Sequence, residues 1–249
     1  MAGHSKWANI KHRKSAVDAK RSKAWSKLSK AIIVAVKMGG PDPSGNSRLR
    51  TAIADAKSVS MPKDNIKRAI KKASGDNDGT VYEELVYEGY GVEGVAIMCD
   101  ALTDNRNRTS PELKKIFENN GGNMGTTGCV SFMFDRKGLF VIDAEKISEE
   151  KLMELAMESG AEDIATRDGQ FEVTCDPDVF SDVSEALEAA ELECESQQVT
   201  RIPQNTVDLD AEAAKQVLKL MDELDDHDDL QKVSANFNIS DEVMSEISE

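Results

Sequence analysis

The spacing of apolar residues divides the chain into an all-helical first part and a mixed remainder. Apolar residues recur at helical spacing between residues 25 and 36, and the stripe ends at a Gly-Gly-Pro sequence. Two further amphipathic segments, residues 46–57 and 62–74, have the same period. Three short helices of this kind can share one core. The sequence therefore predicts a polar arm followed by a three-helix domain, together residues 1–74.

The second part of the chain mixes strands with helices after a linker rich in Gly and Asp. Two strands joined by a glycine-rich turn come first, at residues 81–87 and 95–100. A Thr-Ser-Pro-Glu sequence at residues 109–112 has capping-box character and predicts the start of the next helix. Two strands, residues 130–134 and 139–142, are then expected to form a hairpin around Asp-Arg-Lys-Gly.

The next segments follow the order strand, helix, strand, strand, helix, strand. This order is that of a ferredoxin-like sandwich and predicts a βαββαβ domain over residues 135–205. A long helix and a last strand remain within residues 206–240. They are expected to return to the sheet of residues 80–134 and to make the middle domain discontinuous. The predicted fold class is therefore α+β, with a three-helix domain followed by two α/β (ferredoxin-like) sandwich domains.

Charge is distributed unevenly between the two parts. Residues 1–72 carry eighteen Lys or Arg and four acidic residues, a balance of +14. Residues 73–249 carry thirteen bases and forty-two acids, a balance of −29. A basic segment favours binding to phosphate groups, and an acidic surface repels nucleic acids and membranes. We therefore expect the first part to contact nucleic acid and the acidic body to restrict other contacts.

The sequence has no feature typical of export, of a membrane protein or of a redox site. No apolar run approaches the roughly 18–20 residues that span a bilayer, and no apolar segment of a secretory signal follows Met1. The cysteines, Cys99, Cys129, Cys175 and Cys194, lie at wide spacings without a Cys-x-x-Cys pattern. These features predict a cytoplasmic protein with no membrane partner and no cofactor.

Several short patterns are similar to ligand sites but lack the context that such sites require. Residues 89–94 match Gly-x-Gly-x-x-Gly, yet a strand and not a helix follows, so a turn between strands is expected. Residues 74–79 match the start of a calcium loop without its bidentate Glu. Acidic residues 222–229 are expected to form a helix end and not a metal site. No catalytic arrangement and no small-molecule site is evident, so a non-catalytic protein is predicted.

Two groups of cations are the candidate nucleic-acid contacts. The arm combines four cations with a Trp and a His that can stack on unpaired bases, and its charge continues as a lysine stripe on the first helix. The alternative for the arm is a solvated tail. Two arginines before a predicted helix start can either hold a phosphate or pair with acidic neighbours. The predicted contact residues are Lys6, Trp7, Lys11, His12, Arg13, Lys14, Lys20, Lys23, Lys27, Lys30, Arg106 and Arg108.

The motifs of this chain resemble those of the YebC family. They include Gly-His-Ser-Lys-Trp at 3–7, His-Arg-Lys at 12–14, Tyr-Glu-Gly-Tyr-Gly at 87–91 and Asp-Asn-Arg-Asn-Arg-Thr at 104–109, with shorter matches at 9, 121–123 and 240–242. The resemblance covers nearly the whole chain. It implies one helical and two α/β domains in a crescent. Members are generally described as cytosolic DNA-binding transcriptional regulators. Others, including mitochondrial translational activators, are assigned to the ribosome, where they support synthesis through stretches such as consecutive prolines.

The sequence thus predicts a non-catalytic nucleic-acid-binding regulator of gene expression. The family resemblance favours DNA as the target. The alternative is a ribosome-associated translation factor that binds ribosomal RNA, favoured by Trp7 and His12 in the arm and by the lack of a helix with base-reading Asn or Gln. A protein-interaction module built on the βαββαβ domain and a carboxylate- or metal-dependent enzyme are the remaining alternatives. The acidic body is also expected to compete with phosphates for the basic segment.

Overall fold

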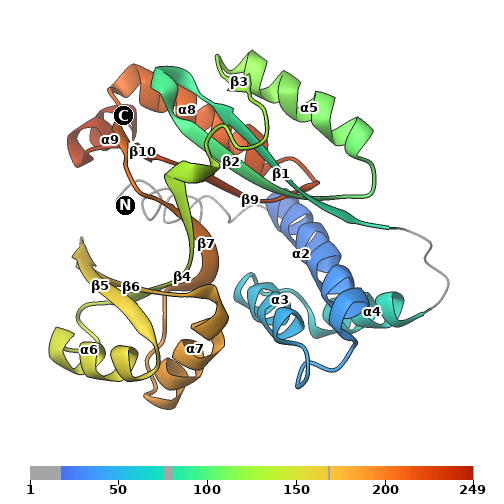
Figure 1. Ribbon diagram of the computed structural model, residues 1–249, viewed down its shortest axis with the longest axis vertical. Helices are drawn as coiled ribbons and strands as arrows, with labels where there is room; N and C mark the ends of the chain where they lie inside the picture. The colour runs from blue at the N-terminus through green and yellow to red at the C-terminus, as the bar shows by residue number, and fades with distance from the viewer. Residues whose placement is uncertain (1–17, 76–80, 168, 249) are drawn as a thin grey trace. The chain divides into compact units, whose positions relative to one another are not determined.

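The computed structural model describes residues 18–75, 81–167 and 169–248, and these form two compact units (Figure 1). The larger unit comprises the described residues before 133 and after 204, and the smaller unit comprises residues 133–204. The domain limits predicted from the sequence, residues 1–74, 80–134 with 206–240, and 135–205, stay predictions.

Three helices begin the described part of the larger unit: α2 (Asp18–Gly39), α3 (Ser47–Ser58) and α4 (Lys63–Ser74). They enclose one core, as their apolar spacing predicted, with Ile32, Leu49 and Ile66 among its buried side chains. The buried Asn46 amide fixes the turn between α2 and α3. Its nitrogen donates to the carbonyl oxygens of Ala35 and Gly40 at 2.8 and 2.9 Å, and its oxygen accepts from Leu49 N at 3.0 Å.

The rest of the larger unit is built on a four-stranded antiparallel sheet. Its strands are β1 (Glu83–Tyr90), β2 (Ala96–Thr103), β3 (Asn123–Met124) and β9 (Leu230–Ala235), in the order β3-β1-β2-β9. The helices α5 (Arg106–Asn119) and α8 (Ala211–Asp225) share a core with it. The 3-10 turn Val92–Gly94 joins β1 to β2, which confirms that the Gly-x-Gly-x-x-Gly sequence forms a turn.

The C-terminal segment returns to this sheet, as the order of elements predicted. β9 pairs with β2, and Cys99 lies opposite Val233. After β9, the short strand β10 (Phe237–Asn238) pairs in parallel with β8 (Val207–Asp208), and α9 (Asp241–Ser248) packs against α8. The sequence reasoning did not include α9. Helix α2 also packs against β9, so the helical region and the sheet are in direct contact.

The smaller unit is a ferredoxin-like βαββαβ sandwich, as predicted. Its elements are β4 (Phe134–Asp143), α6 (Glu149–Glu158), β5 (Ala161–Arg167), β6 (Gln170–Cys175), α7 (Phe180–Ala189) and β7 (Ser196–Pro203). The strands are antiparallel in the order β5-β6-β4-β7. Phe140, Leu152 and Leu187 are fully buried in its core.

Two local predictions are wrong: the hairpin of residues 130–142 and the start of the helix that follows β2. In place of the predicted strand over residues 130–134, residues 131–133 form a 3-10 turn. Residues 135–138 do not form a hairpin turn but lie inside β4, where Gly138 pairs with Val199 of β7 and with Cys175 of β6. Strand pairing on both sides of β4 outweighs the turn propensity of Asp-Arg-Lys-Gly. Helix α5 begins at Arg106, ahead of the predicted capping box, because the Asn105 side chain accepts a hydrogen bond from Arg108 N at 3.2 Å.

Candidate nucleic-acid interface

The basic arm lies outside the described residues. This holds for Lys6, Trp7, Lys11, His12, Arg13 and Lys14. The remaining predicted contact residues belong to two helices of the larger unit. Lys20 lies near the start of α2, the other three lysines follow it along that helix, and Arg106 and Arg108 lie in the first turn of α5.

Three lysines of α2 contact the acidic segment that joins α8 to β9. We call Lys23, Lys27 and Lys30 the α2 lysine row and residues 225–229 the acidic loop. Lys23 Nζ lies 3.3 Å from the carbonyl oxygen of Asp226 and 3.8 Å from its carboxylate, and Lys27 Nζ donates to the carbonyl oxygen of Asp225. Lys30 Nζ donates to the Asp228 carbonyl at 3.0 Å and to Asp229 Oδ1 at 2.8 Å. The row that the sequence predicted as a phosphate contact therefore binds acidic residues of the same chain.

Asp229 is the buried centre of these contacts. Only 3% of its side chain is exposed. Besides Lys30, it accepts hydrogen bonds from Arg108 Nη2 at 2.7 Å and from the Thr109 and Thr103 hydroxyls at 2.8 and 3.1 Å. Burial alone would raise the pKa of Asp229, but the hydrogen bonds from Lys30, Arg108 and Thr109 outweigh burial and hold the pKa well below its usual range. Asp229 therefore remains ionised and joins α2 to β2 and α5.

His227 extends the same network to the exposed side of α5. Its Nδ1 accepts from the backbone N–H of Asp229 at 3.2 Å, and its Nε2 lies 3.1 Å from Glu112 Oε2. Because Nδ1 is an acceptor, the ring donates from Nε2 to the Glu112 carboxylate. The acidic loop is thus held on one side by the α2 lysine row and on the other by the contact between His227 and Glu112 of α5.

The two arginines of α5 have different surroundings. Arg108 pairs with Asp229 and, at 3.1 Å, with Asp104, so it makes the local acidic pairs that the sequence left as one of two alternatives. Arg106 is exposed at the start of α5. Burial raises the pKa of the Tyr87 phenol, and the nearby Arg106 guanidinium opposes this rise.

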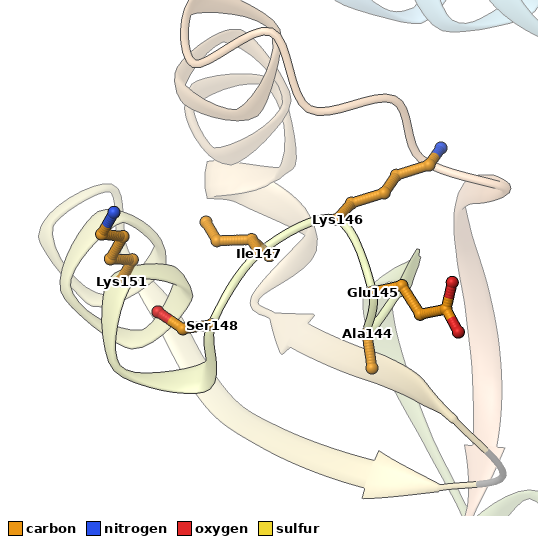
Figure 2. A pocket seen from close by; sticks show the side chains of 6 residues that line it. All are labelled: Ala144, Glu145, Lys146, Ile147, Ser148 and Lys151. Atoms are coloured by element: carbon orange, nitrogen blue, oxygen red, sulfur yellow. The ribbon is translucent and has the colours of Figure 1, made fainter.

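The smaller unit contributes an open surface hollow at the start of α6. Lys146 and Lys151 border it with four neighbouring residues, and Figure 2 shows these two lysine side chains extending away from each other. Lys146 Nζ donates a hydrogen bond to the carbonyl oxygen of Glu193 at 3.2 Å. The two ammonium groups do not converge on a common ligand. Within the described residues no group of His, Cys, Asp and Glu is arranged to hold a metal ion.

Comparison with known proteins identifies the family. A family model described as the TACO1/YebC protein N-terminal domain matches residues 5–76, and one described as the TACO1/YebC second and third domain matches residues 82–237. The chain belongs to the TACO1/YebC family. This membership confirms the resemblance that the motifs indicated.

Relatives of the family match this chain over its whole length. A protein of Rhodopirellula baltica named "probable transcriptional regulatory protein" is 59% identical over 99% of this chain and 100% of its own length. A protein of Geobacter sulfurreducens with the same designation is 53% identical over the same shares of both chains. The crystal structure of a conserved hypothetical protein from Aquifex aeolicus, 47% identical, covers 95% of this chain and 98% of its own, with a TM-score of 0.83. This chain therefore shares its fold with the Aquifex protein.

Sequence reasoning missed the residues that organise the acidic loop. It treated Asp229 as one of several acids at a helix end, named Thr109 only within a helix-start pattern and a family motif, and did not single out Thr103. Their role depends on contacts between residues more than 100 positions apart, such as Thr109 with Asp229. The alternation of β2 and β9 could have placed Thr103 and Asp229 at neighbouring strand ends, but only with the strand pairing known.

Among the described helices, none has the length and apolar character needed to cross a bilayer.

Proposed function

We propose that this protein is a non-catalytic regulator of gene expression that binds nucleic acid in the cytoplasm. The observation that carries the proposal is the charge separation, +14 over residues 1–72 against −29 over the rest of the chain. Multiple cations on one segment neutralise phosphates and release counterions, which is the main source of affinity for nucleic acid. The names of the Rhodopirellula and Geobacter relatives support a role in regulation of transcription, and thus DNA as the target.

The arm would supply the first contacts. Lys6, Lys11, Arg13 and Lys14 would neutralise phosphates, and Trp7 would stack on a base. His12, Lys20 and Arg106 are further proposed contacts. The α2 lysine row and Arg108 would join them only when the acidic loop releases these side chains, because both now bind that loop.

Ribosomal RNA is the second candidate target, with a role in translation on the ribosome. Trp7 and His12 favour it, because single-stranded RNA exposes unpaired bases on which such rings stack. In the first turn of α5, Arg108 is bound to carboxylates and is not placed to read base edges in a major groove.

Crosslinking in cells tests the proposal and separates the two targets. The tagged full-length chain is crosslinked with ultraviolet light, recovered under denaturing conditions, and the attached nucleic acid is sequenced. A variant in which Lys6, Lys11, Arg13 and Lys14 are all replaced by Gln serves as the matched control. Enrichment of genomic DNA over the control supports the transcriptional role, and enrichment of ribosomal RNA supports the translational role. Equal recovery by both proteins contradicts the proposal.

A further inference from the structure

Several cations of the helical region with described side chains already bind other groups of the chain. The α2 lysine row contacts the acidic loop. In α3, Arg48 pairs with Glu84, and Arg50 donates to the carbonyl oxygens of Pro43 and Ser44 at 2.9 and 3.0 Å. A polyanion that binds these side chains must first break those contacts.

The outward face of α4 differs from these surfaces. Lys63, Lys67, Arg68 and Lys71 are all exposed, and the described residues place no carboxylate within ion-pair distance of them. We call these four residues the α4 cation row. Asp64 is the single acid of the helix sequence, so the helix surface stays strongly positive.

Helical spacing places this row opposite the core. Ile66 and Ala69 are buried in the core that α4 shares with α2. Lys63, Lys67 and Lys71 recur every four residues, slightly more than one helical turn, and are exposed. With a rise of 1.5 Å per residue, successive lysines of this series lie about 6 Å apart along the axis. The three lysines therefore form an exposed series along one side of the helix, and Arg68 lies about 100° around the helix from Lys67.

Resting on the function proposed above, we infer that the α4 cation row is the face of the helical region that contacts the phosphodiester backbone of the bound nucleic acid. A linear series of cations matches a linear series of phosphates, whereas a single small anion needs converging donors in a pocket. Exposed Lys and Arg side chains of this kind contact the phosphate backbone of a nucleic acid and fix its position, but they do not read the base sequence. The row would thus provide affinity common to DNA and RNA, while the α2 lysine row holds the helical region on the acidic loop.

Salt-dependent binding of the full-length protein tests this inference. The test variant carries Lys63→Gln, Lys67→Gln, Arg68→Gln and Lys71→Gln, since Gln has nearly the same helix propensity. The matched control carries four neutralised lysines on exposed positions of α5 and α8: Lys114→Gln, Lys115→Gln, Lys215→Gln and Lys219→Gln. The two variants have the same net charge, so a difference in their binding reflects the location of the lost cations and not their number. Fluorescence anisotropy with a labelled DNA duplex and a labelled RNA hairpin is followed between about 50 and 200 mM salt.

The α4 variant should bind at least about tenfold more weakly than the control, and the log–log salt slope should be less steep by about 0.9 for each lost contact with duplex. Weakening on only one probe identifies the nucleic acid that the row contacts. If the two variants have equal affinity and equal slope while the unmodified protein binds with the usual salt dependence, this inference is overturned and the proposed function is not. Absence of salt-dependent binding by the unmodified protein overturns the proposed function as well. The single variant Lys67→Gln, with a slope change near 0.9, repeats the test with the smallest structural change.

Discussion

Replacing Asp229 with Asn should destabilise the larger unit by about 3 kcal/mol. The substitution keeps the size of the side chain but removes the charge that binds Lys30 and Arg108. The Lys30 pair is mostly buried, with 20% and 3% of the two side chains exposed, so its loss should cost about 2 kcal/mol. Arg108 is 45% exposed and its pair should contribute only about 0.5 kcal/mol. Weaker bonds from Thr103 and Thr109 account for the rest.

Urea unfolding measured through Trp25 provides the assay. Trp25 lies in α2 and donates from Nε1 to the Val59 carbonyl at 3.3 Å, so its fluorescence reports the helical region. The protein has a second Trp, which is replaced by Phe in all variants. With a urea dependence of about 2–3 kcal/mol per molar, the unfolding midpoint of Asp229→Asn should fall by about 1 M or more.

The control is Asp226→Asn, in the same loop. Asp226 is 53% exposed, its carboxylate lies 3.8 Å from Lys23 Nζ, and the backbone bond from Lys23 is kept. The free energy of unfolding should therefore change by less than about 0.5 kcal/mol. If Asp229→Asn is no more destabilising than Asp226→Asn, the account of Asp229 as the buried centre of the loop is refuted.

Comparing the unmodified protein with Asp229→Asn also gives a pH dependence of stability, and its sign follows from the pKa of Asp229. The pKa of Asp229 is lowered in the folded protein, whereas an unfolded Asp titrates near about 4. Its contribution to stability is therefore fully present above that value and is lost as the pH falls below it toward the lowered pKa. The difference in stability between the unmodified protein and Asp229→Asn should shrink below about pH 4.

Two other substitutions test the local structure. Asn46→Ala removes the cap of α3 and two further hydrogen bonds, one buried and one part-buried, so urea unfolding should show a loss of about 2–3 kcal/mol, whereas Ser47→Ala beside it should change little. Glu88 is buried and accepts from three backbone N–H groups of residues 128, 130 and 131 at 2.7–2.9 Å. Glu88→Gln should lower the midpoint of thermal unfolding by several degrees, and the exposed Glu84→Gln should have a much smaller effect; equal shifts would contradict this reading.

The parts of the fold that follow from local patterns could be predicted from the sequence. Helical spacing gave the three helices of the first part, and the alternation of elements gave the βαββαβ unit. The glycines of residues 89–94 were correctly assigned to a turn, because a strand follows them. In each case, the decisive information lies within a few residues of the element concerned.

The predictions that failed, and the contacts that were missed, depend on distant partners. Asp-Arg-Lys-Gly has turn propensity, but β4 continues through it because β6 and β7 pair with it on both sides. The α2 lysine row was correctly placed on one stripe of a helix, yet its partner is an acidic loop about 200 residues away in the sequence. Periodicity shows that a cationic face exists; it does not show which acid of the chain lies against it.

The central claim, that the basic segment binds nucleic acid, is tested most directly by the salt dependence of binding after the arm is neutralised. Full-length protein with Lys6, Lys11, Arg13 and Lys14 replaced by Gln is titrated with a labelled RNA hairpin and a labelled DNA duplex, beside the unmodified protein. The account predicts a large loss of affinity and a salt slope less steep by up to about 3.6 for duplex. Unchanged affinity and an unchanged slope on both probes would contradict it.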